Sequence, residues 1–176
     1  TGSGALKALQ RVMEGRDRES LAFLNAHGTA TMFNDQMESV AIQKAGLSDV
    51  PLTALKGWYG HTFGASGVIE AVISMMAVEK GVVLPVRGFS EIGVSGKINI
   101  SSELRNTGKH SFLKMISGFG GCNGAALYSM DKPCGDGEES YGRGRMPQVM
   151  NGANADLQCI HSVKLTDSSL EIDGER

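Results

Sequence analysis

Apolar and polar positions along this chain alternate between helical and strand-like spacing as far as about residue 132. Residues 4–13 carry leucine and methionine side chains at helical intervals, which predicts a short amphipathic helix that ends near Gly15. Residues 21–24 form an unbroken apolar run, which is typical of a strand buried on both faces. The chain therefore opens with a helix followed by a central strand.

A second helix, a second strand and an unusually apolar helix follow. Asp35 and Glu38 have the three-residue spacing of a capping box, which predicts a helix that starts near residue 35 and ends at Gly46. Residues 51–55 are compatible with a strand. Residues 65–80 are apolar on nearly every helical face, which predicts a buried helix.

Three further strand-like segments complete the regular part of the chain. They are residues 97–100, 111–116 and 125–130, and a Gly-rich turn joins the last two. The order of elements predicts an α/β fold, with helices layered on a mixed sheet in an α-β-α arrangement. A crossover helix normally follows a strand, so we expect the first strand of the fold to be missing from this sequence.

The composition changes after about residue 132. Residues 133–156 are rich in Gly and polar side chains, which indicates a linker. Residues 157–176 regain alternating apolar positions, with a possible turn at 166–169, and predict a small hairpin. We therefore divide the sequence into a domain over 1–132, a linker and a strand-like tail.

Charge and cysteine usage narrow the functional classes. The 176 residues carry a formal net charge of -2, which argues against nucleic acid and membrane surfaces as partners. No segment resembles a transmembrane span or a secretory signal. Cys122, Cys134 and Cys159 have neither disulfide-framework nor zinc spacing, so we expect a cytoplasmic protein with no bound metal.

Polar residues that can perform chemistry follow two neighbouring predicted strands. His27 lies just past the first strand, and Lys56 and His61 lie just past the second. The carboxyl ends of strands in an open α/β sheet meet at one edge, so we expect the two imidazoles to lie close together. Two N–H donors aimed at one oxygen would stabilise an enolate, which suits decarboxylation or Claisen-type attack on a thioester. Glu70 is the best carboxylate partner for the lysine.

Other polar residues and glycines can be explained by structural roles as well as by functional ones. The hydroxyls of Thr29 and Thr31 could bind a polar ligand arm or could satisfy loop amides. The glycines at 118–121 lack the dinucleotide-binding spacing and precede a strand rather than a helix. Cys122 lies in a tight turn that enters a strand, which favours a packed residue over a nucleophile. His110 and His161 have no such context and are read as ordinary histidines.

Five motifs in order resemble a known family. They are N-A-H-G-T-x-T at 25–31, D-x-x-E at 35–38, K-G-W-Y-G-H at 56–61, G-A-S-G-x-x-E at 64–70 and G-F-G-G-C-N at 118–123. In order and spacing they resemble the C-terminal half of a β-ketoacyl-acyl carrier protein synthase, a condensing enzyme of the thiolase-like superfamily. The resemblance covers about residues 4–132 and does not extend to the tail.

The resemblance implies a thiolase-like fold of which this chain supplies the C-terminal half. It implies that His27 and His61 are paired catalytic histidines that polarise a malonyl thioester carbonyl, with Lys56 and its ion-pair partner Glu70 beside them. Thr29 and Thr31 would hold a phosphopantetheine arm, Phe119 would be a gating residue, and Asp35 and Glu38 would support the site. The substrates would be carried on acyl carrier protein, with no permanently bound cofactor.

The resemblance also marks what this sequence lacks. The nucleophilic cysteine of the family belongs to the N-terminal half, which nothing here matches, so we expect this chain alone to be inactive. We expect it to associate with that half, as a homodimer or heterodimer.

Two alternative functions stay open: a non-catalytic partner subunit of the chain-length-factor type, and a degradative thiolase that uses coenzyme A thioesters. Acyl chain length and the choice between fatty acid and polyketide biosynthesis also stay open.

Overall fold

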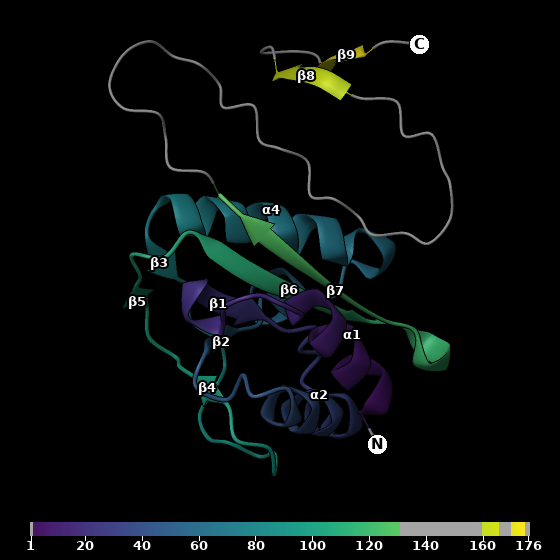
Figure 1. Ribbon diagram of the computed structural model, residues 1–176, viewed down its shortest axis with the longest axis vertical. Coiled ribbons are helices and arrows are strands. Elements are labelled where there is room, and N and C mark those ends of the chain that lie inside the picture. The colour runs from purple at the N-terminus through teal and green to yellow at the C-terminus, as the bar shows by residue number, and fades with distance from the viewer. Residues whose placement is uncertain (1, 131–159, 166–169, 175–176) are drawn as a thin grey trace. The chain divides into compact units, whose positions relative to one another are not determined.

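A computed structural model describes residues 2–130, 160–165 and 170–174 (Figure 1). The chain divides into two units, Thr1–Lys132 and Pro133–Arg176. Within the described ranges, no helix combines the length and the apolar character that crossing a bilayer requires.

The first unit contains four α-helices and seven strands among its described residues. The helices are α1 (Ser3–Met13), α2 (Met32–Lys44), α3 (Lys56–Tyr59) and α4 (Ser66–Glu79), with short 3₁₀ turns η1 (Arg18–Ser20), η2 (Phe63–Ala65) and η3 (Phe119–Gly121). The strands are β1 (Leu21–Asn25), β2 (Pro51–Thr53), β3 (Val82–Val83), β4 (Asn99–Ile100), β5 (Arg105–Asn106), β6 (Ser111–Ser117) and β7 (Asn123–Ser129).

Five of these strands form one mixed sheet in the order β4-β2-β1-β6-β7. β4, β2, β1 and β6 pair in parallel, and β7 returns antiparallel to β6. β3 and β5 pair separately as a two-stranded antiparallel sheet. The α/β class and the mixed sheet predicted from the sequence are confirmed.

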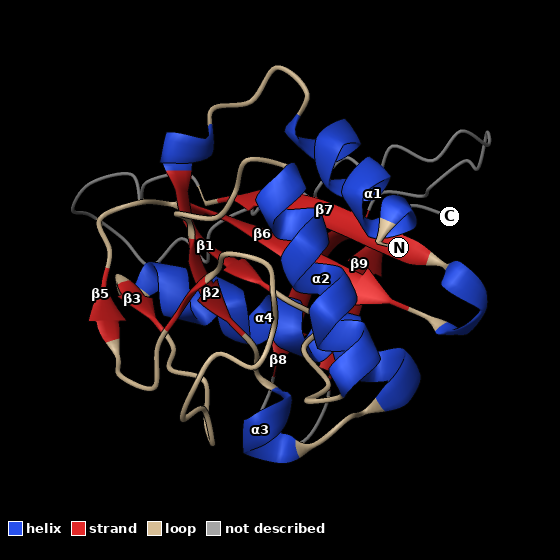
Figure 2. Ribbon diagram, turned by 90° about the horizontal axis from the view of Figure 1, so that it is seen from below, coloured by secondary structure: helices blue, strands red, loops and turns tan. Residues whose placement is uncertain are grey.

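Helices cover both faces of the sheet (Figure 2). α1 and α2 pack on one face, where Leu9 and Ile42 meet Leu24 of the central strand. α4 packs on the other face, where Ala77 contributes to a second core with Phe23. The five residues of β1 are all buried because the strand contributes to both cores, Leu21 and Leu24 to the first and Ala22 and Phe23 to the second. An unbroken apolar run, as in residues 21–24, is what a strand covered on both faces requires.

α4 approaches β6 closely near its first turn. A Cβ atom placed on Gly67 would lie 2.7 Å from Cδ1 of Ile116, which is too close for an undisturbed contact. Glycine at this position therefore lets the helix backbone pack directly over the strand. This packing brings the first turns of α4 to the end of the sheet where β1 and β2 finish.

Three local expectations need correction. α2 begins at Met32 after Thr31, with no side-chain cap, so the capping box at Asp35 and Glu38 is wrong. Cys122, expected to be a packed residue, is exposed. The outward face of α4 is exposed, at 69% for Val68 and 49% for Val72, because nothing in the described part of the chain covers it.

The second unit is described only in two strands. β8 (Ile160–Leu165) and β9 (Leu170–Gly174) pair antiparallel, as the alternating pattern predicts for a hairpin. The predicted turn at 166–169 and the predicted linker at 133–156 lie outside the described residues.

Candidate functional site

His27 lies in the loop that follows β1, and α2 holds this loop in place. The backbone N–H groups of His27 and Gly28 donate to the two carboxylate oxygens of Glu38, at 2.7 Å and 2.8 Å. Asn34 donates a third hydrogen bond to the same carboxylate, at 2.8 Å. Burial raises the pKa of Glu38, and these three hydrogen bonds act against that rise. Glu38 therefore braces the loop.

Gly28 allows the loop to turn at this point. Its φ of 49° lies in the left-handed region, and a Cβ atom would come within 2.5 Å of Cβ of Ala54. Only glycine meets both demands without strain. The turn directs His27 toward the end of β2 and the start of α3.

Lys56 stands at the start of α3, buried beside His27. Its ammonium group donates to Oε1 of Glu70 at 2.7 Å, to the carbonyl oxygen of His27, and to Nδ1 of His27 at 3.3 Å. Ser66 donates to the same oxygen of Glu70 at 2.8 Å. Three acceptors satisfy the three protons of the ammonium group, which is what burial of a lysine requires.

A second lysine, which the sequence analysis did not single out, meets the other oxygen of Glu70. Lys114 of β6 forms an ion pair with Oε2, and its side chain is 5% exposed. Burial alone would raise the pKa of Glu70, but Lys114 and Lys56 outweigh it and hold the pKa below its usual value. The only local signal for Lys114 is a charged residue inside an otherwise apolar strand.

His61 lies on the turn after α3 and is exposed. The backbone N–H of Phe63 donates to its Nδ1 at 3.1 Å, and the two rings stack with centroids 5.3 Å apart. Phe63 has a φ of 50°, an uncommon backbone conformation for a residue with a side chain. In this conformation the N–H of Phe63 points toward the imidazole.

The two imidazoles meet edge to face. Their ring centroids are 5.2 Å apart, with an interplanar angle of 78°. In each ring Nδ1 faces a donor, Lys56 for His27 and the Phe63 N–H for His61, so in the neutral ring the proton belongs on Nε2. Burial, and then the charges of Lys56 and Lys114, lower the pKa of His27 to about 4. His27 is therefore a neutral N–H donor near pH 7.

The remaining predicted residues lie on the His27 loop, on α2 and in η3. Thr29 is half-buried and Thr31 is exposed in the loop that carries His27, and their hydroxyl oxygens are 2.8 Å apart. Phe119 lies in η3 with its side chain fully exposed. Asp35 accepts from Asn34 at 3.2 Å and lines, with Glu38, a cavity of about 280 Å³.

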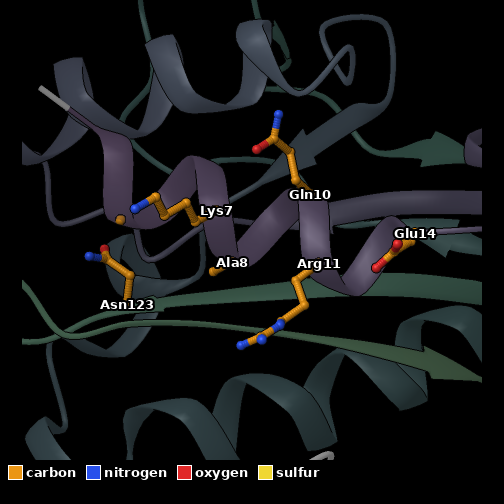
Figure 3. Close-up of a pocket in the computed structure, with 7 residues that line it drawn as sticks. Lys7, Ala8, Gln10, Arg11, Glu14 and Asn123 are labelled. Carbon is orange, nitrogen blue, oxygen red and sulfur yellow. The ribbon is translucent and has the colours of Figure 1, made fainter.

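The described part of the first unit has two hollows, one of them lined by Ala26 and Gly28 on either side of His27. The 280 Å³ cavity lies between α2 and the segment 86–94, and its lining does not include His27 or His61. An open hollow along α1 is flanked by Lys7, Arg11 and, from β7, Asn123 (Figure 3). In the described part of the chain, no group of three or more His, Cys, Asp or Glu side chains is placed to hold a metal ion.

The chain is similar to a family of known proteins. Residues 1–90, about half of the chain, match the β-ketoacyl synthase C-terminal domain. The 3-oxoacyl-acyl-carrier-protein synthase 1 of Escherichia coli K12 is 32% identical over 125 residues, which are 70% of this chain and 30% of that protein. The tetracenomycin ketoacyl synthase alpha subunit of Streptomyces glaucescens is 31% identical over 121 residues, 66% of this chain and 28% of that subunit.

Solved structures give the same result for the fold. A β-ketoacyl synthase from Burkholderia phymatum superposes with a TM-score of 0.67 and 29% identity, covering 72% of this chain and 32% of that one. A ketosynthase in complex with its chain length factor, from Xenorhabdus doucetiae, gives a TM-score of 0.63 and 26% identity, covering 70% and 32%. The expected thiolase-like fold is thereby confirmed.

The chain thus spans about a third of the length of the proteins it matches. The matched part is the C-terminal domain, in agreement with the resemblance drawn from the five motifs. The chain belongs to the β-ketoacyl synthase family and carries its C-terminal domain.

Proposed function

We propose that this chain is the C-terminal part of a β-ketoacyl-acyl carrier protein synthase, an acyltransferase that condenses an acyl thioester with a malonyl thioester. The observation that carries the proposal is the pair of imidazoles 5.2 Å apart, each with Nδ1 occupied as an acceptor. Each ring then offers Nε2–H to a bound ligand. Two such donors on one carbonyl oxygen form an oxyanion hole.

In the proposed reaction, His27 and His61 bind the thioester carbonyl oxygen of the malonyl group. The bond between Cα and the carboxylate breaks, carbon dioxide leaves, and the electron pair moves onto the thioester oxygen as an enolate. The Cα of the enolate attacks the acyl carbon held on a cysteine, and the cysteine thiolate leaves. A neutral imidazole donates a hydrogen bond to the enolate without transferring its proton, so the carbon nucleophile stays reactive.

Lys56 and Glu70 support this arrangement. Lys56 donates to Nδ1 of His27, so the proton of a neutral ring stays on Nε2. Glu70 neutralises the lysine and keeps it in place at 2.7 Å. Asp35 and Glu38 support the site without contacting the substrate, and Glu38 does so by accepting hydrogen bonds from the backbone of the His27 loop.

The substrate carrier in this proposal is acyl carrier protein, which the names of the matched synthases include. Thr29, half-buried, and Thr31, exposed, lie on the loop that carries His27, where their hydroxyls would hold the phosphopantetheine arm. Phe119 is exposed at the end of β6 and would gate the site. In this proposal the N-terminal half supplies the nucleophilic cysteine. The same half covers the apolar face of α4. The assembled enzyme is a dimer.

The decisive experiment is His61→Ala in the assembled enzyme, this chain together with the N-terminal half. Loss of one oxyanion donor should lower malonyl decarboxylation by about 100- to 1,000-fold. The exposed residue His110 gives the matched control, because His110→Ala removes an imidazole away from the candidate site and should leave the rate unchanged. Unchanged turnover in His61→Ala would contradict the proposal.

A second experiment concerns the chain alone. Incubated with acyl and malonyl carrier protein, it should form no ketoacyl product, because the proposed nucleophile belongs to the N-terminal half. Product formation by the isolated chain would show that the nucleophile lies within these residues.

The alternative function is that of a non-catalytic partner subunit, and a ketosynthase structure with its chain length factor is among the similar structures. The side chain at the nucleophile position in the N-terminal half separates the two: cysteine for the enzyme, glutamine or another residue for the partner. The retention of two paired histidines favours the enzyme.

A further inference from the structure

Lys114 is a charged residue in the middle of a buried strand. It pairs with Asn25 of β1 on one side and Ala126 of β7 on the other, and its neighbours Leu113 and Met115 belong to the core. Only 5% of its side chain is exposed. An ammonium group in such a place loses its hydration, and only ion pairs and hydrogen bonds compensate for that loss, so its contacts indicate what it does.

Every acceptor of Lys114 belongs to the segment before His27 or to Glu70. Its Nζ donates to the carbonyl oxygen of Ala26 at 3.0 Å and to the side-chain and main-chain oxygens of Asn25 at 3.4 Å and 3.5 Å. It also forms the ion pair with Oε2 of Glu70. Lys114 therefore ties the end of β1, the residue next to His27 and the carboxylate on α4 to one point.

The charge of this cluster is not balanced. Lys56 and Lys114 share the one carboxylate of Glu70, so these three groups carry one net positive charge beside His27, which the nearby carboxylate of Glu38 offsets only in part. The charged groups that act on Lys114 are Glu70 from α4, Lys56 from α3 and Glu38 from α2. Burial lowers the pKa of Lys114 to about 8, against the opposing effect of Glu70, so it remains largely protonated at pH 7.

We propose that Lys114 is a positioning residue for the condensation: it fixes Glu70 and the Ala26 carbonyl, and its charge adds to burial and to the charge of Lys56 in disfavouring protonation of His27, the Nε2–H donor. A protonated His27 would transfer its proton to the enolate instead of donating a hydrogen bond, and the carbon nucleophile would be quenched. The catalytic meaning of this inference rests on the proposed function, whereas the effect of Lys114 on His27 does not.

The test compares Lys114→Met with Lys97→Met by NMR titration of ¹³C-labelled histidine in the assembled enzyme. Methionine keeps the length of the lysine stem without its charge, and Lys97 is a matched control because its side chain is 73% exposed. Lys114→Met should raise the titration midpoint of His27 by about one pH unit, since a nearby positive charge is removed. Lys97→Met should leave the midpoint where it is in the wild type.

Two further variants keep the test decisive. If Lys114→Met does not fold, Lys114→Gln removes the charge while retaining a donor for the Ala26 carbonyl, and the same upward shift is expected. Lys114→Arg keeps the charge and should keep the wild-type midpoint, which a purely packing role would not predict. A His27 midpoint in the charge-removing variant that matches the wild type would overturn the inference.

The pH profile of malonyl decarboxylation supplies the catalytic readout. The acid limb of the profile should move upward in Lys114→Met by the same amount as the NMR midpoint, because protonation of His27 removes the neutral donor. If the NMR shift occurs and the acid limb stays in place, the positioning role is overturned. Failure of the proposed function itself would appear separately, as an unchanged rate in His61→Ala.

Discussion

The two histidines of the candidate site lie in opposite surroundings. His27 is buried, and its loop is held by Glu38 while its ring is held by Lys56. His61 is exposed and is contacted by the backbone N–H and the ring of Phe63 and by the edge-to-face ring of His27. The His27 side of the site is therefore built entirely within this chain, whereas the His61 side faces outward, toward the surface that the proposed N-terminal half would cover.

The His27 side of the site is restrained by many contacts, whereas the His61 side is accessible from outside the chain. The buried side has an ion-paired network in which each contact restrains the next, and such a network is costly to break. The exposed side has few contacts, so substitutions there should affect chemistry or association more than folding. The following predictions use this difference.

Glu70→Gln should give the largest loss of stability. The substitution leaves Lys56 and Lys114 buried without a carboxylate, which should lower the free energy of unfolding by about 3–5 kcal/mol. The control is Asp49→Asn, because Asp49 pairs with Lys97 on the surface and the loss should be under about 1 kcal/mol. Urea denaturation measures both, and equal losses would show that burial of the network contributes nothing.

Glu38→Gln should have the next largest effect. The amide oxygen of Gln can accept one of the two backbone hydrogen bonds from His27 and Gly28, and the other N–H loses a charged acceptor. We expect a loss of about 1–2 kcal/mol in the free energy of unfolding. Hydrogen exchange of the two amides should accelerate in the variant, and unchanged protection would mean that Glu38 does not brace the loop.

Acid should destabilise the wild type through His27. Its pKa of about 4 in the folded chain lies below the usual 6.5, so the unfolded chain binds a proton more readily between these values. Stability from this group is present above pH 6.5 and is lost as the pH falls toward 4. Allowing for solvent screening, the loss by pH 4.5 should be about 1 kcal/mol larger in the wild type than in His27→Asn. Parallel urea stability curves for the two proteins against pH would contradict this.

Val72→Lys on the outward face of α4 should change folding least. Val72 is 49% exposed, so its replacement should alter the free energy of unfolding by under about 0.5 kcal/mol. The same change should weaken association, because an exposed apolar helix face commonly marks an interface. Sedimentation velocity at micromolar concentration measures this, with Gln10→Lys on α1 as the surface control. A wild-type chain that is already a monodisperse monomer would contradict the expected association.

The sequence by itself determined the kinds of elements and their order. The apolar run at 21–24 required a strand covered on both faces, and the ordered motifs placed His27, Lys56, His61 and Glu70 at neighbouring strand and helix ends. These features are local, since periodicity and spacing along the chain express them directly.

Only the tertiary structure decided how the side chains meet. Glu38 has the spacing of a helix cap, yet it turns to the amides of His27 and Gly28, because those amides lie beside α2 only once the sheet has formed. Lys114 sits in an apolar strand with no local partner, and the parallel register of β6 on β1 brings it to Ala26 and Glu70. Long-range contacts of this kind depend on register and packing, so they leave no pattern in the sequence around either residue.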